Sequence, residues 1–296
     1  MNAKRKGAVK QGLSFFAFTS PAVVLIIAFV GIPFCMCIYY SLCKWNGWDK
    51  SVSFNGLDNY VKLFTGDAGF WDAFRFTFIY AAGVVALVNL TALFIASLLQ
   101  TNIRAKGLFR SAFYIPNIIG MVVIGFIWKF ICVRVFDALL AITGWRIFGL
   151  SWLGDPNLTV ITTILVTVWQ NLGFYLVIYI AGLQSVPNEM LEAASIDGAG
   201  GLKRFFRITF PLIMPSVSFC MFYSAANSLK MFELIFSLTG GGPGTATTPM
   251  TLNIYNTLFN NNQFGYGSAK SVFLFVVVMI ISVAQVTFFK NREVEA

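Results

Sequence analysis

Six long stretches without a charged residue constrain the fold of this chain more than any other feature of its sequence. Each is close to the about 20 apolar residues that a helix needs to cross the hydrocarbon core of a membrane. Charged residues make up 11% of the 296 residues, against about 25% in soluble domains, and hydrophobic residues make up 57%. The sequence therefore predicts an all-α integral membrane protein with six transmembrane helices, over residues 13–43, 73–100, 108–132, 157–184, 212–238 and 268–290.

Lys and Arg in the connecting segments predict the orientation of these helices. With a cytoplasmic N-terminus, the inner segments hold 12 such residues and the longer outer segments hold 7. The inner residues are Lys4, Arg5, Lys6, Lys10, Arg104, Lys106, Arg110, Lys203, Arg204, Arg207, Lys290 and Arg292. The outer residues are Lys44, Lys50, Lys62, Arg75, Arg134, Arg146 and Lys270. We expect cytoplasmic tails over residues 1–12 and 291–296, around a membrane domain over 13–290. Topology and anionic lipid explain the net charge of +9, so no nucleic acid partner is expected.

Residues typical of catalytic or metal sites are rare in the sequence. It contains no histidine and no CxxC pair, and its five cysteines lie in or at the ends of predicted helices, where cysteine mostly acts as a small apolar residue. A membrane enzyme would need a cluster of carboxylates or histidines within the membrane. We therefore expect no catalytic residue, no metal site and no enzymatic activity in this chain.

A polar segment between the fourth and fifth predicted helices, about residues 185–211, cannot lie in lipid and must face water or another protein. Asn188 is a good N-cap for a first helix, and Gly198 is expected to end it as the C′ residue. A second short helix, about residues 202–209, combines basic and aromatic residues and can anchor at the membrane surface. The segment is thus predicted to form a helix–turn–helix.

The spacing E-A-A-x3-G-x9-I-x-F-P in this segment resembles the cytoplasmic loop by which permease subunits of ATP-driven, binding-protein-dependent importers dock onto their ATPase. The resemblance assigns this role to Glu192, Ala193, Ala194, Asp197, Gly198, Ile208 and Pro211. Ala193 and Ala194 would form a narrow ridge that enters a groove of the partner, and Glu192 would meet an Arg or Lys there. The family usually has Leu where this chain has Phe210, which exchanges one apolar residue for another.

Four further stretches resemble the permease subunits of carbohydrate ABC importers of the maltose and glycerol-3-phosphate type. These are Phe54–Tyr60, Trp152–Pro156, Ala181–Pro187 and Thr239–Gly244. The resemblance implies the type I ABC importer permease fold in a bacterial cell membrane. It also implies a second, related permease subunit, an ATPase homodimer, an extracellular solute-binding protein, and a sugar or oligosaccharide substrate. The alternative is an importer permease for a non-sugar solute, such as a peptide, a phosphonate or an amino acid.

The glycine-rich stretch from Gly240 to Thr245 does not predict a phosphate-binding loop. A Walker loop has the pattern G-x4-G-K-[ST], and no Lys follows these glycines. We expect a flexible outer hinge here, because Gly, Pro and Thr between 239 and 248 would leave backbone groups unsatisfied in lipid. ATP and Mg²⁺ are therefore expected on the partner ATPase, with no cofactor in this chain.

Polar residues within the predicted helices are candidates for a solute path, because such residues usually face a cavity or the bundle interior. Amides can pair with sugar hydroxyls and aromatic rings can cover sugar C–H faces. The candidates on the fourth and fifth helices, where the resemblance also places solute contacts, are Asn171, Tyr175, Asn227, Ser228 and Met231. The alternative role is hydrogen bonding between helices. Lys230 and Glu233, three residues apart, are expected to be able to pair with each other.

Overall fold

The computed structural model describes residues 15–100 and 105–290, which form two compact units. The first unit comprises Met1–Gly66 and Ile254–Leu274, and the second comprises Asp67–Asn253 and Phe275–Ala296. The tails expected over residues 1–12 and 291–296 lie outside the described residues, as do Arg104 and the basic residues of both tails.

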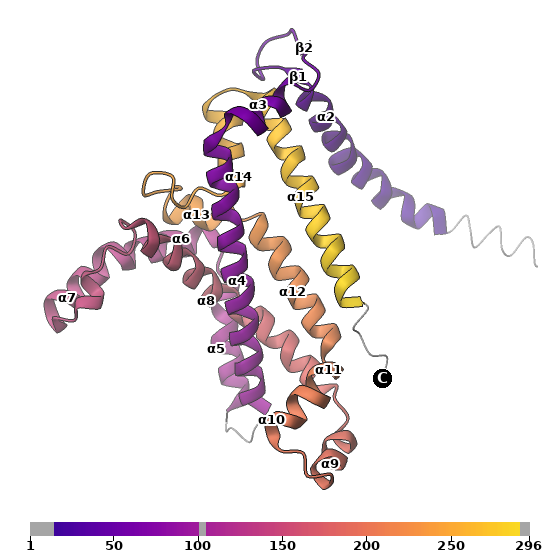
Figure 1. The fold of residues 1–296 in the computed structure, drawn as a ribbon, viewed down its shortest axis with the longest axis vertical. Helices are drawn as coiled ribbons and strands as arrows, with labels where there is room; N and C mark the ends of the chain where they lie inside the picture. Colours follow the sequence, from indigo (N-terminus) through magenta and orange to yellow (C-terminus); the bar gives the residue numbers. More distant parts are fainter. Residues whose placement is uncertain (1–14, 101–104, 291–296) are drawn as a thin grey trace, which may run out of the picture. The chain divides into compact units, whose positions relative to one another are not determined.

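The first unit holds an N-terminal helical run, a small hairpin, a short helix and the later segment over residues 254–274 (Figure 1). The run extends from Phe15 to Ser41 and includes η1 (Ile27–Gly31) and α2 (Ile32–Ser41). Strands β1 (Cys43–Lys44) and β2 (Ser53–Phe54) pair antiparallel, with Cys43 opposite Phe54, and α3 (Asp58–Gly66) follows. Buried Asn59 of α3 donates to the carbonyls of Ser41 and Cys43, each at 2.9 Å, and so fixes α3 against the end of α2.

The second unit contains most of the helices, which Figure 1 labels in chain order. They are α4 (Ala68–Gln100), α5 (Lys106–Ile118), α6 (Met121–Phe130), η2 (Ile131–Val135), α7 (Phe136–Thr143), η3 (Arg146–Gly149), α8 (Pro156–Gln184), α9 (Asn188–Ile196), α10 (Gly201–Arg204), η4 (Phe205–Thr209), α11 (Phe210–Leu212), α12 (Met214–Leu229) and α13 (Glu233–Leu238). Two elements are shared between the units, α14 (Met250–Tyr255) and α15 (Phe264–Lys290), and η5 (Asn256–Asn260) belongs to the first.

The core of the second unit forms where α4 packs along both α8 and α12, and where α5 packs against α8. Tyr80 of α4 and Tyr179 of α8 are among its largest fully buried side chains. The start of α8 is fixed by Asp155, whose carboxylate accepts from the N–H groups of Asn157 and Leu158 at 2.9 Å, as N-cap residues do. This packing gives α8 neighbours on several sides, and the candidate path lies along one of them.

The prediction of six hydrophobic spans agrees with four long helices and two bent pairs. The long helices run over Phe15–Ser41, Ala68–Gln100, Pro156–Gln184 and Phe264–Phe289. Six spans result if each bent pair counts as one, the pairs being Lys106–Ile118 with Met121–Thr143 and Gly201–Leu212 with Met214–Leu229; the second pair begins earlier than the predicted fifth helix. The described helices of the 233–270 gap, α13, α14 and η5, are all short, so this gap supplies no further span, as expected.

The third and fifth predicted helices are interrupted, which the prediction of continuous helices missed. The third turns by 96° between α5 and α6, because Ile119 and Gly120 are extended shortly after Pro116, a residue that cannot donate a helical hydrogen bond. The fifth stops at Leu229 and restarts at Glu233. Both interruptions place non-helical backbone within a hydrophobic segment.

Three smaller expectations also change. The segment predicted as the first outer loop carries the β1–β2 pair, although only helices were expected. Lys270, counted as an outer-loop charge, lies inside α15 at 3% exposure, and its ammonium donates to Thr257 Oγ1 at 2.9 Å. The glycine-rich loop, expected to be a flexible hinge, is held by hydrogen bonds. Thr247 Oγ1 donates to the Gly242 carbonyl at 2.6 Å and lies 2.8 Å from Thr239 Oγ1.

Candidate solute path and docking loop

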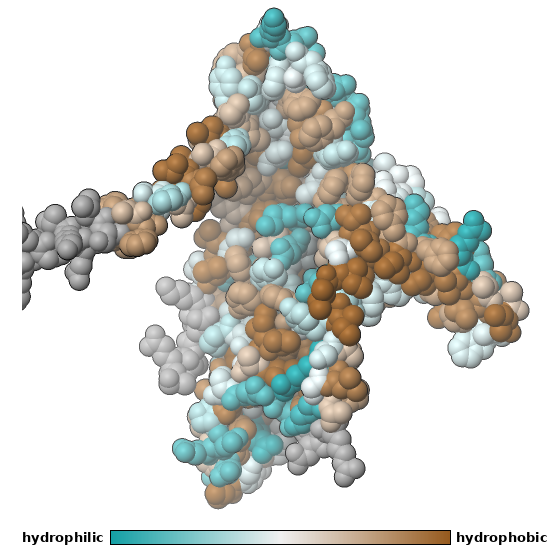
Figure 2. All heavy atoms as spheres, turned by 180° about the vertical axis from the view of Figure 1, so that it is seen from behind, coloured by the Kyte–Doolittle hydropathy of each residue, from teal (hydrophilic) through white to brown (hydrophobic). Residues whose placement is uncertain are grey.

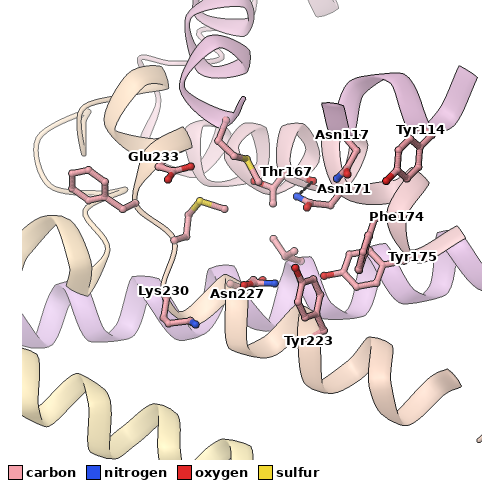
Figure 3. Close-up of a pocket in the computed structure, with 15 residues that line it drawn as sticks. Tyr114, Asn117, Thr167, Asn171, Phe174, Tyr175, Tyr223, Asn227, Lys230 and Glu233 are labelled. Carbon is pink, nitrogen blue, oxygen red and sulfur yellow. Dashed lines mark hydrogen bonds between the residues drawn. The ribbon is translucent and has the colours of Figure 1, made fainter. Parts of the chain in front are cut away.

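A cavity of about 660 Å³ in the second unit brings all five predicted path residues together (Figure 3). Asn171 and Tyr175 come from α8, about halfway along that helix. Asn227 and Ser228 come from the end of α12, and Met231 from the interruption that follows. A cavity of this size is within the range of small-molecule sites.

Most polar side chains of this cavity keep hydrogen-bonding capacity that the protein does not use. The amide nitrogen of Asn171 donates to the Thr167 carbonyl at 3.0 Å, within its own helix, and its oxygen has no partner among the described residues. The hydroxyl of Tyr175 and the amide of Asn227 also have no protein partner in the described part of the chain. Tyr175 is 3% exposed, and its ring lies against Phe174 and Tyr223, with centroid distances of 5.3 and 6.3 Å.

The helix interruption after α12 changes the expectation for Lys230 and Glu233. The two residues line the cavity, but they do not pair, because no helical turn joins them and their side chains point to different parts of the cavity (Figure 3). The interrupted backbone is held by Thr251, whose hydroxyl donates to the Met231 carbonyl. Both charges are thus left on exposed side chains of the cavity.

A second polar cluster in the same unit is fully paired. The hydroxyl of Tyr179 donates to Asn89 Oδ1 at 2.7 Å, and Asn89 Nδ2 donates to Ser224 Oγ at 3.0 Å. Asn89 lies on α4, Tyr179 on α8 and Ser224 on α12. We call these three residues the three-helix network, because they join three helices within the buried core.

The predicted docking loop has the expected helix–turn–helix form. Helix α9 ends at Ile196, and Gly198 adopts a φ of +74°, which side chains other than glycine rarely adopt. Its N–H bonds the Ser195 carbonyl at 3.2 Å, and the Ala199 N–H bonds the Ala194 carbonyl at 2.9 Å, as in a Schellman motif. The role of Gly198 as C′ residue is therefore confirmed, whereas Asn188 is the first helical residue, and Pro187 takes the N-cap position.

Burial separates the predicted docking residues into three groups. Glu192, Ala193, Asp197 and Gly198 are exposed, whereas Ile208 and Pro211 are half-buried. Ala194 is only 5% exposed, so it packs inside the loop and does not extend the exposed ridge expected of the alanine pair. Ile196, which the sequence interpretation passed over, is 87% exposed and lies one turn after Glu192 on α9.

The family of this chain follows from sequence comparison. A family described as "Binding-protein-dependent transport system inner membrane component" matches residues 89–292. The chain belongs to this family. It is therefore a multi-pass membrane protein and the permease component of a binding-protein-dependent importer, a class of transport proteins rather than enzymes.

Two relatives and one solved structure are similar over nearly the whole chain. The probable starch degradation products transport system permease protein AmyD of Thermoanaerobacterium thermosulfurigenes is 40% identical over 295 residues, 99% of each chain. The multiple sugar-binding transport system permease protein MsmF of Streptococcus mutans is 32% identical over 94% of this chain and 96% of the relative. A chain of a bacterial ABC transporter involved in alginate import has a TM-score of 0.81 at 19% identity, covering 97% and 99%, and shows the ABC importer permease fold.

The permease's cavity also contains residues that the sequence interpretation missed. Tyr114 and Asn117 of α5 line it opposite Asn227 and Tyr223 of α12 (Figure 3). Their spacing of three residues on one helix was a usable signal, as was their position before the Gly120 bend. Gly173 of α8 allows α5 to approach, because an added Cβ would lie 2.5 Å from Tyr114 Cα.

Two other polar residues of α8, Trp169 and Gln170, do not line the cavity. The Gln170 amide is 3% exposed and donates to the Ile119 carbonyl at the bend, and Trp169 packs against Trp128. Within the residues that the structure describes, no group of three or more Cys, Asp or Glu side chains is placed to hold a metal ion.

Proposed function

We propose that this permease carries a sugar or oligosaccharide through the cavity between α5, α8 and α12. The observation that carries the proposal is the set of aromatic rings and of amides with unused hydrogen-bonding groups, because sugars present hydroxyls for the amides and C–H faces for the rings. Asn171, Tyr175, Asn227, Ser228 and Met231 are the proposed contacts. The names of the relatives, which refer to starch degradation products and multiple sugars, support the same solute class.

A zwitterionic solute such as a peptide is the second candidate, favoured by one observation. Lys230 and Glu233 offer an unpaired ammonium and an unpaired carboxylate on the same cavity. A solute with both charges could pair with each of them. The solute panel below therefore includes short peptides beside the sugars.

Uptake by the complete transporter tests the solute proposal. Asn227→Ala removes an amide that makes no protein contact, so we expect a few-fold loss of uptake for the transported sugar with unchanged assembly. The assay uses a panel of oligosaccharides, including starch degradation products, and short peptides. Peptide uptake without sugar uptake would reject the sugar assignment, and normal sugar uptake by the variant would remove Asn227 from the path.

We further propose that the permease pairs with a second, related permease subunit and an ATPase homodimer, and receives its solute from an extracellular solute-binding protein. In this arrangement both termini and the docking loop are cytoplasmic, and ATP and Mg²⁺ are bound by the ATPase. The exposed Glu192, Ala193 and Asp197, with Ile196, supply charge and apolar surface for docking. Cysteines placed at Thr245 and Gly200, in a background without the native cysteines, test the orientation. An impermeant reagent applied outside should label only the first.

A matched pair of acidic residues tests the docking role. Glu192 and Glu189 are both exposed on α9, one turn apart. We expect Glu192→Ala to lower ATPase association and transport several-fold, because it removes the proposed partner of an Arg or Lys, and Glu189→Ala to have little effect. Co-purification with the ATPase and transport rate are the measurements. Equal behaviour of the two variants would reject the specific role of Glu192.

A further inference from the structure

A second cavity of the permease, of about 490 Å³, lies between the docking loop and the ends of α4 and α8. Its walls come from the last residues of α4 and α8 and from the two helices of the loop, all within the second unit. Gln100, Gln184, Asn188, Arg204 and Thr209 supply its polar side chains. Hydrophilic side chains gather toward this end of the second unit, where Figure 1 draws α9 and α10 (Figure 2).

The polar lining of this cavity favours an anion. Arg204 uses one N–H group to donate to Ser195 Oγ at 2.8 Å, which leaves further N–H groups of its guanidinium for a ligand. The side chains of Gln184, Asn188 and Thr209 have no hydrogen-bond partner among the described residues. No carboxylate lines the cavity within the described part of the chain. A guanidinium surrounded by amides and a hydroxyl, without an opposing acid, suits the oxygens of a phosphate group.

The position of this cavity adds a second constraint. Gln100 and Gln184 are the last residues of α4 and α8, two helices long and apolar enough to span a membrane. The cavity therefore lies at the ends of two candidate membrane spans, where we expect lipid headgroups to meet the protein. Leu183, Val186 and Leu191 add apolar surface beside the polar groups, so a ligand with both characters fits.

We propose that this cavity binds a phosphate group, either the phosphodiester of an anionic phospholipid or a soluble phosphate ester. The bound group contacts Arg204 from the second loop helix and Gln184 from the end of α8. It thereby ties the loop to the membrane-spanning helices and fixes the position of α9, which carries Glu192. The site is separate from the solute cavity and does not depend on the identity of the solute.

The chain offers four variants that separate a specific site from general charge. Arg204→Gln removes the guanidinium. Lys203→Gln removes the same charge at the preceding residue, which is exposed and does not line the cavity. Ser195→Ala removes the hydrogen bond that Arg204 makes within the loop but keeps the guanidinium. Gln184→Leu adds a change that breaks no hydrogen bond with the described residues.

Native mass spectrometry of the purified full-length protein, titrated with phosphatidylglycerol, measures the binding. We expect about ten-fold weaker binding for Arg204→Gln, a few-fold loss for Gln184→Leu, and changes of less than about two-fold for Lys203→Gln and Ser195→Ala. Addition of millimolar inorganic phosphate or glycerol phosphate distinguishes the sources. Displacement of the lipid assigns the site to soluble phosphate, and retention assigns it to the phospholipid.

Three results would overturn the proposal. Equal losses for Arg204→Gln and Lys203→Gln would show a diffuse charge effect. A loss for Ser195→Ala as large as that for Arg204→Gln would show that loop geometry, not the guanidinium, controls binding. Unchanged lipid binding in every variant, together with no competition by inorganic phosphate or glycerol phosphate, would show that the cavity takes no phosphate group.

Discussion

Two neighbouring tyrosines of α8 show how this permease uses polar groups in two different ways. Tyr179 is 1% exposed, and its hydroxyl bonds Asn89 in the three-helix network. Tyr175, one turn earlier, is almost as buried, yet its hydroxyl has no protein partner and its ring lines the solute cavity. In a membrane, a paired polar group holds helices together, whereas an unpaired group beside a cavity is available for a ligand.

The largest effect on this comparison is expected from a change that pushes α5 away from α8, because α5 forms one side of the solute cavity. Gly173→Val should destabilise the protein by about 3 kcal/mol, because the new side chain would overlap the backbone of Phe113 and Tyr114. It should also abolish uptake, since α5 carries the cavity residues Tyr114 and Asn117. Thermal unfolding of the purified complex and sugar uptake measure the two effects.

Gly107→Val is the matched control for this change. Gly107 also lies on a helix, but no atom lies within 4 Å of the position that its Cβ would take. We expect a much smaller effect on stability and normal uptake. Equal effects at the two glycines would show that the close approach of α5 and α8 is not what Gly173 provides.

The three-helix network should respond in stability alone. Asn89→Leu removes the two hydrogen bonds of the network and the bond to the Val85 carbonyl, and leaves the Tyr179 hydroxyl without its acceptor, which should lower stability by about 1–2 kcal/mol. Uptake per assembled complex should remain normal. Thr91→Val on the same helix is the control, because its hydroxyl bonds only carbonyls of α4. Reduced uptake at normal stability in Asn89→Leu would place the network in the solute path.

The smallest and sharpest test exchanges single hydroxyls. Tyr179→Phe should lower stability by about 1 kcal/mol without changing uptake per complex. Tyr175→Phe should leave stability unchanged and reduce uptake a few-fold, because it removes only a group that the protein does not use. Unfolding and uptake measured side by side decide the outcome. If Tyr175→Phe destabilised the protein and Tyr179→Phe impaired transport, the two roles would have to be exchanged.

The sequence predicted well those features that depend on local composition. The absence of charges over long stretches located the hydrophobic helices, and the position of Gly198 located the end of α9. The five residues predicted for the solute path do line one cavity, and four of them were chosen because polar side chains are rare inside apolar helices; their contact with solute stays a prediction. All of these signals lie within about one helical turn or one span.

The missed features depend on which sides of the helices meet. Asn89, Tyr179 and Ser224 are far apart in the sequence, so nothing local indicates that they bond one another. The same limit applies to Ala194, because a pair of alanines does not show which of the two faces inward. The bend after α5 could have been predicted from the sequence, since Pro116 and Gly120 both disfavour a continuous helix.

The interruption between α12 and α13 also determines how the permease can exist in a membrane. It leaves Asn227, Lys230 and Glu233 exposed on the open side of the cavity, beside backbone that has left the helix. Both polar side chains and non-helical backbone are unfavourable in contact with hydrocarbon, and each charge would cost roughly 3 kcal/mol at the membrane centre. A copy of the chain inserted alone would therefore expose these polar groups to lipid. In the assembly proposed above, the second permease subunit would cover this side, so we expect copies of this chain made in excess of that subunit to be unstable in the membrane.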